Sequence, residues 1–114
     1  MSTMTDLIDG QIVEYRARNL DEFLSYYSVD AVIKGADGNV LMEGEVAMRE
    51  FYGPLFRDSP ELRLEIPRRI DFGDYVIDEE LVDGVNLEGY PPQLHAVVVY
   101  RVKDSKIRHV TFLM

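Results

Sequence analysis

The sequence predicts an α+β fold, in which helices cover one face of a strongly bent antiparallel or mixed sheet of about six strands. Three observations indicate this class. Apolar residues recur at helical spacing in three segments of the first half, and they alternate with polar residues over most of residues 62–113. Turn sequences such as Asp37-Gly38 separate the strand segments. The 114 residues suffice for one hydrophobic core, so we expect a single domain over residues 1–114.

Three helices are expected. Residues 5–18 carry one apolar stripe, and Asn19 opens a short second helix whose stripe extends to Tyr27. A third apolar stripe covers residues 45–57. Pro54 has no backbone N–H to donate, so we expect it to kink the last turn of that helix.

The strand segments follow from alternation, β-branched residues and turns. The predicted strands cover residues 31–34, 40–42, 62–72, 75–83, 93–102 and 106–113. A sheet of this length twists and bends around its helices. We therefore expect a half-open cone whose concave face is filled by side chains or by a ligand.

Composition excludes several functions. The chain has 12 Lys and Arg against 21 Asp and Glu, a net charge of −9, which disfavours nucleic acid and anionic membranes as partners. It has no cysteine, which removes disulfides, thiolate nucleophiles and cysteine-held metals. Residues 1–7 lack the pattern of a secretory signal, and no apolar run approaches the roughly 20 residues of a membrane span, so we expect a cytoplasmic protein.

Four stretches carry a resemblance to a known family. They are Tyr15–Leu24, Tyr27–Ile33, Gly44–Phe56 and Ala96–Ile107. In these stretches the chain resembles the nuclear-transport-factor-2-like superfamily, in particular its SnoaL-like members, which include polyketide cyclases and ketosteroid isomerases. The resemblance covers nearly the whole chain and implies a cone of about six strands and three helices with a pocket between them. Activity differs from member to member of this superfamily.

The resemblance also tests one activity residue by residue. Ketosteroid isomerases carry a carboxylate base at the end of the first strand, where this chain has Gly35. The positions that match their two oxyanion donors are Gln11 and Val98. The resemblance therefore disfavours an isomerase of that type.

The run Ile77 to Leu81 contains the acidic residues that could act chemically. Side chains of a strand alternate between faces, so Asp78 and Glu80 share one face and Glu79 takes the other. On the helix-covered side, Asp78 or Glu80 would be desolvated and could serve as a general base. Alternatively, all three acids lie at the open rim in water and oppose edge-to-edge pairing.

Aromatic residues are the candidates for ligand contact. The predicted ligand-binding residues are Tyr15, Tyr27, Phe51, Tyr52, Phe56 and His95. A buried phenol needs a partner, so these tyrosines either meet backbone acceptors or bind a ligand oxygen. His95 either lies on the outer sheet face or acts as an acid or base in the pocket. It and His109 are out of register, so no metal site is expected, and no cofactor.

Two further features concern the surface. The loop Gly84–Pro92, with Tyr90 at its tip, is a candidate lid. Val97, Val99 and Ile107 are expected to form an apolar stripe on the outer sheet face. Such stripes mark interfaces, so we expect a homodimer through this face.

Together, these patterns predict a protein that binds a small apolar or hydroxylated molecule in an internal pocket. The alternative is a cofactor-independent isomerase, cyclase or hydrolase that uses Asp78 or Glu80 for proton transfer.

Overall fold

The computed structural model describes residues 4–114, which form three helices and six strands. Residues 1–3 of the predicted domain lie outside the described range. The elements are α1 (Met4–Ala17), α2 (Leu20–Leu24), β1 (Tyr27–Gly35), β2 (Val40–Glu43), α3 (Gly44–Asp58), β3 (Arg63–Phe72), β4 (Tyr75–Asp83), β5 (Leu94–Lys103) and β6 (Lys106–Leu113).

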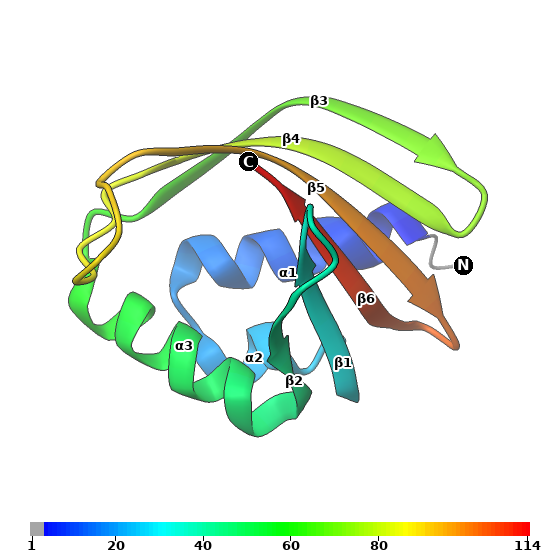
Figure 1. Ribbon diagram of the computed structural model, residues 1–114, viewed down its shortest axis with the longest axis horizontal. Coiled ribbons are helices and arrows are strands. Elements are labelled where there is room, and N and C mark those ends of the chain that lie inside the picture. The colour runs from blue at the N-terminus through cyan, green and yellow to red at the C-terminus, as the bar shows by residue number, and fades with distance from the viewer. Residues whose placement is uncertain (1–3) are drawn as a thin grey trace.

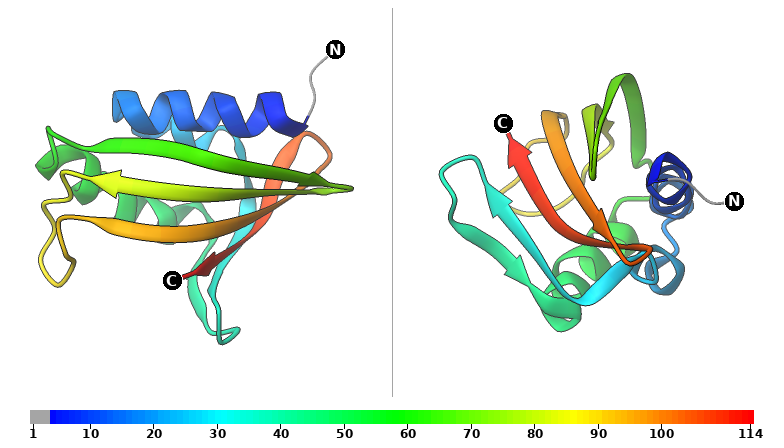
Figure 2. Two further views of the ribbon diagram at one scale, coloured as in Figure 1. Left: turned by 90° about the horizontal axis from the view of Figure 1, so that it is seen from above. Right: turned by 90° about the vertical axis from the view of Figure 1, so that its right-hand side faces the viewer.

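Within this range the strands form one mixed sheet in the order β2-β1-β6-β5-β4-β3. The β1–β6 pair is parallel, and the other neighbouring pairs are antiparallel. The sheet arches over the helices without closing (Figure 1). Helix α1 runs alongside β3 (Figure 2). The predicted fold class is confirmed.

The structure corrects one local expectation and adds a detail to another. Tyr27 begins β1 rather than ending the second helix, because its backbone pairs with Ile107 of β6, and this long-range pairing overrides the local helical stripe. Pro54 does not end helix α3, which continues to Asp58, and Leu55 and Phe56 of its last turn are buried in the core.

The core lies between the helices and the concave face of the sheet. Phe23 of α2 is at its centre, 1% exposed. Its ring contacts the rings of Tyr15, Tyr27, Tyr52 and Phe56 at centroid distances of 4.8–5.9 Å. No helix within residues 4–114 combines the length and the apolar character needed to cross a bilayer.

The two faces of β5 differ as its alternation predicts. Val98 and Tyr100 are buried on the concave side, and Val97 and Val99 are half-buried on the convex side. Ile107 does not join that outer stripe, and this expectation was wrong because Ile107 is fully buried. The register of β5 against β6 shifts after Arg101, so Ile107 pairs with the inward-facing Val102.

Candidate functional site

A cavity of about 250 Å³ lies between the concave face of the sheet and the helices. Its walls come from every helix and strand as well as from the β4–β5 loop and the chain end, and they are mostly aliphatic and aromatic. The lining residues are Gln11, Tyr15, Phe23, Tyr27, Leu41, Met42, Phe51, Tyr52, Leu55, Leu64, Glu80, Val82, Val85, Leu87, Tyr90, Leu94, Ala96, Tyr100, Phe112 and Met114. This volume and composition are typical of a site for a small ligand.

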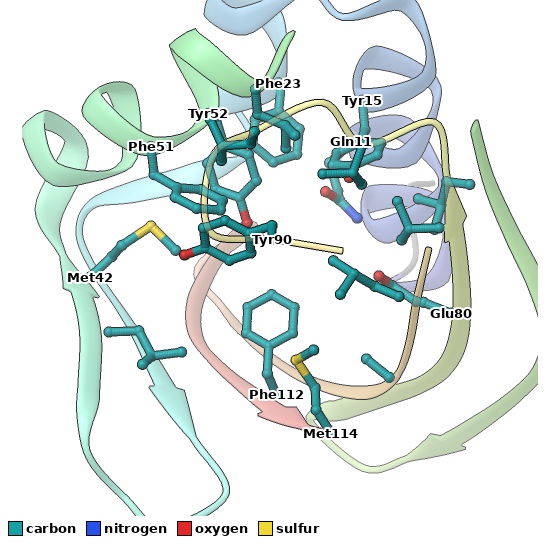
Figure 3. A pocket seen from close by; sticks show the side chains of 18 of the residues that line it. Gln11, Tyr15, Phe23, Met42, Phe51, Tyr52, Glu80, Tyr90, Phe112 and Met114 are labelled. Carbon is teal, nitrogen blue, oxygen red and sulfur yellow. The ribbon is translucent and has the colours of Figure 1, made fainter. Parts of the chain in front are cut away.

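A chain of four hydrogen-bonded side chains crosses the polar part of the wall. The Tyr27 hydroxyl donates to Gln11 Oε1 at 3.1 Å. Gln11 Nε2 donates to the Tyr100 hydroxyl at 3.3 Å, and that hydroxyl donates to Glu80 Oε2 at 2.7 Å. Gln11 and Glu80 approach the cavity from the same side (Figure 3). Helix α1 and strands β1, β4 and β5 thus converge on one carboxyl group.

The direction of this chain determines where the proton of Glu80 lies. The Tyr100 hydroxyl accepts a hydrogen bond from Gln11 Nε2 and donates its single hydrogen in the bond to Glu80 Oε2. As long as Tyr100 donates to Oε2, a proton taken up by Glu80 sits on Oε1. No hydrogen bond among the described residues involves that oxygen, and it is not one of their fully buried unpaired atoms.

Burial dominates the electrostatics of Glu80, which is 7% exposed. It raises the pKa of Glu80 from 4.5 to about 7, and the Tyr100 hydrogen bond lowers that pKa in part. The nearby charge of Asp78 adds to the increase, and the charge of Arg69 opposes it. Near neutral pH this carboxyl group can therefore both accept and donate a proton.

Asp78 shares the face of Glu80 but has a different environment. It is 0% exposed, and the Arg69 guanidinium binds it through two bonds, from Nε at 2.6 Å and Nη2 at 2.9 Å. Arg69 Nη1 also binds Asp9 of α1 at 2.6 Å. This ion pair holds α1 against β3 and β4, and Asp78 is not part of the cavity wall.

The predicted ligand residues divide into two groups. Tyr15, Tyr27, Phe51 and Tyr52 line the cavity. Phe56 does not line it, because its ring packs behind Tyr15 at 5.3 Å.

His95 lies outside the cavity. Its side chain points to the convex face of the sheet, like those of Val97 and Val99, and is 62% exposed. Its Nε2 lies 2.7 Å from Glu79 Oε2. His109 is exposed and pairs with Arg101, so the two histidines do not meet.

The sequence reasoning did not identify Tyr100 as a cavity residue. The alternation of side chains along the strand could have identified it, because Tyr100 is four residues after Ala96 and both therefore face the same side. Tyr90, the tip of the candidate lid, does line the cavity, and its ring contacts Phe51 at 5.6 Å. Val98, one of the two isomerase-matched positions, is packed in the core.

The described part of the chain shows no group of side chains arranged to bind a metal ion. No three His, Asp or Glu side chains of residues 4–114 converge as ligands would. Glu80 has the only carboxyl side chain among the described lining residues, and the other polar side chains there are Gln11 and five tyrosines.

Comparisons with known proteins agree with this architecture. An uncharacterised cystatin-fold protein from Novosphingobium aromaticivorans is 26% identical, with a TM-score of 0.88 over 100% of both chains. A proposed polyketide cyclase from Sinorhizobium meliloti is 17% identical, with a TM-score of 0.75 over 94% of this chain and 93% of that one. AclR, a proposed hydroxylase from Streptomyces galilaeus, is 19% identical, with a TM-score of 0.79 over 95% and 85%.

No curated protein matches the sequence. The family model of the SnoaL-like domain matches residues 6–110, which include the hydrogen-bonded chain from Tyr27 to Glu80 and nearly all of the cavity wall. The protein therefore belongs to the SnoaL-like domain family.

Proposed function

We propose that the protein binds a small, largely apolar molecule in the cavity, with the polar group of that molecule at Glu80. One observation carries the proposal. Apolar walls converge on a buried carboxyl group that has one oxygen held by Tyr100 and the other without a protein partner. Glu80 lines the cavity, so the polar group of a bound ligand can pair with that free oxygen.

The size of the cavity limits the ligand. Its volume of about 250 Å³ lies just below the roughly 300–1,000 Å³ of pockets for drug-sized molecules, so the proposed ligand is a small one. Affinity would come chiefly from apolar surface removed from water, at roughly 25 cal/mol per Å².

Binding can be tested with uncharged aromatic alcohols and ketones of this size, followed by amide chemical shifts. Ala96→Phe places a ring into the cavity and should abolish binding. Val13→Phe adds the same ring on the exposed face of α1 and serves as the matched control. Equal binding by both variants, each folded by circular dichroism, would contradict the proposal.

A second candidate function is proton-transfer catalysis without a cofactor, as an isomerase, cyclase or hydrolase. It is favoured by the pKa of Glu80, which burial raises to about 7. The similarity to a proposed polyketide cyclase supports it at the level of fold. Asp78 is not proposed as the base, because Arg69 occupies both of its oxygens.

Hydrogen exchange tests this candidate. A bound ketone should exchange the hydrogens next to its carbonyl with D₂O faster in the presence of the protein, and Glu80→Gln should abolish the acceleration. Glu79→Gln removes the same charge from the opposite face of β4 and should leave the acceleration intact. No acceleration with any bound ketone would count against catalysis.

We also propose that the protein forms a homodimer through the convex face of the sheet. Apolar residues gather there on β3, β4 and β5: Ile70, Phe72, Ile77, Val97 and Val99. Sedimentation should give a dimer mass for the native chain and a monomer mass for Val97→Asp. Val29→Asp, at another exposed apolar position, should remain a dimer.

A further inference from the structure

We propose that the ligand of this cavity carries a cationic ammonium group, which pairs with the carboxylate of Glu80. The inference rests on the proposed binding function and specifies the chemical class of the ligand. It comes from the charges that line the cavity, the positions of the nearest cations and the arrangement of the aromatic rings.

The cavity wall holds one acidic group and no basic one. Among the lining residues in the described chain there is no Lys, Arg or His, and Glu80 is the sole carboxylic acid. Burial raises the pKa values of the tyrosines Tyr15, Tyr27, Tyr52 and Tyr100, so these phenols stay neutral. Glu80 therefore supplies the only side-chain charge among the described lining residues, and an anionic ligand would meet no compensating side-chain charge.

The nearest cation is already neutralised. Arg69 binds Asp78 through two nitrogens and Asp9 through the third, so this group of three carries a net charge of −1. The other groups that act on Glu80 are neutral phenols, with Tyr100 as the direct partner. An ionised Glu80 thus lacks a counter-ion from the protein, although a buried carboxylate normally has one.

The rings around the cavity stand at steep angles to one another. Phe51 and Tyr52 meet at 88° with centroids 5.0 Å apart, and Phe51 and Tyr90 meet at 65° and 5.6 Å. Tyr15 and Tyr52 meet at 78°. Rings at different angles present both faces and edges to the cavity, and a ring face attracts a quaternary ammonium group through cation–π attraction. Figure 3 shows the rings of Tyr52, Tyr90 and Phe112 on one side of the cavity and Glu80 on the other.

The charge of the whole chain acts in the same direction. At −9 it attracts cations to the protein and raises their local concentration. The alternative ligand is an uncharged hydrogen-bond acceptor that accepts a hydrogen bond from the Oε1–H group of neutral Glu80. The two alternatives predict opposite pH dependence, because a cation needs ionised Glu80 and an uncharged acceptor needs the protonated form.

Choline and its uncharged carbon isostere, 3,3-dimethylbutan-1-ol, separate these alternatives. Both have nearly the same shape, and neither titrates between pH 5.5 and 8.5. With a pKa of about 7, Glu80 is ionised to a fraction of about 0.03 at pH 5.5 and about 0.97 at pH 8.5. Choline should therefore bind about 30-fold more tightly at pH 8.5 than at pH 5.5, measured by NMR titration or calorimetry on the full chain.

Two glutamine variants show whether Glu80 causes the pH dependence of choline binding. Glu80→Gln keeps the shape and should remove both the pH dependence and the preference for choline over the isostere. Glu79→Gln makes the same change in net charge on the outer face and should retain both.

The inference is overturned if the isostere binds as well as choline at pH 8.5, or if the choline preference survives in Glu80→Gln. Binding of uncharged alcohols and ketones without choline binding also overturns it, and it leaves the binding function standing. If no compound of either kind binds, the binding function fails and the inference fails with it.

Discussion

Replacing Glu80 by glutamine should stabilise the protein above neutral pH. The pKa of this carboxyl group is about 7 in the folded protein, where burial raises it, against 4.5 for an unperturbed glutamate. Folding therefore takes up a proton between these two pH values. The stability that depends on this proton is fully present below pH 4.5 and is lost as the pH rises through about 7.

The magnitude follows from the two pKa values. At about 1.4 kcal/mol per pKa unit, the difference between 4.5 and about 7 corresponds to about 3 kcal/mol at pH 8. Glutamine does not ionise, and its carbonyl oxygen can accept the Tyr100 hydrogen bond, so Glu80→Gln should avoid this loss. The variant should match the native protein at pH 4.5 and exceed its free energy of unfolding by about 3 kcal/mol at pH 8.

Urea unfolding followed by far-UV circular dichroism at pH 4.5, 6, 7 and 8 measures the difference between the two proteins. Subtracting the curves removes the pH dependence of the other acids. Glu79→Gln controls for the loss of one negative charge and should show no such divergence, since Glu79 is on the convex face next to His95. Parallel curves for the native protein and Glu80→Gln would refute the burial of an ionisable, unpaired Glu80.

Tyr100→Phe tests the cause of the pKa. A hydrogen bond to a charged group contributes about 1.5–3 kcal/mol, so its loss should raise the pKa of Glu80 by roughly one or two units. Carbon-13 titration of the glutamate carboxyl groups measures the change. An unchanged or lower pKa would show that the Tyr100 hydroxyl does not stabilise the carboxylate.

Two further predictions concern the frame of the site. Arg69→Met leaves the fully buried Asp78 without its partner and should cost about 3–5 kcal/mol in urea unfolding, whereas the double variant with Asp78→Leu should recover most of that loss. Gly84→Ala should destabilise the protein more than Gly89→Ala. Both glycines have positive φ, but a Cβ at Gly84 would collide with the Glu61 carbonyl, whereas a Cβ at Gly89 meets no atom. Thermal melts compare the two variants, and equal melting temperatures would contradict the collision.

Much of the strand arrangement around the site could be predicted, because it depends on side-chain alternation and on turns between neighbouring strands. Alternation along residues 75–83 places Asp78 and Glu80 on one face, and the structure has them so. The turn at Gly73 even predicts the ion pair, since Phe72 opposite Tyr75 brings Arg69 opposite Asp78. This pairing was readable from the sequence by counting back from the turn.

What could not be predicted depends on long-range packing. Ile107 changes face because of an irregularity in the β5–β6 pairing that no residue type marks. The burial of Glu80 requires α1 to bring Gln11, and β5 to bring Tyr100, to the same point of β4. Alternation leaves open whether that face is a solvated rim or a cavity wall, because the answer depends on how far the sheet bends.

The contrast between the two inward-facing acids indicates which one is functional. Asp78 is neutralised by Arg69, so its charge serves the attachment of α1 to the sheet. Glu80 has no such partner, and its ionised form lowers stability at neutral pH. Glutamine would fill the same space, keep the bond from Tyr100 and avoid that loss. Stability therefore does not explain a carboxyl group at this position, whereas a ligand that needs its charge or its proton does.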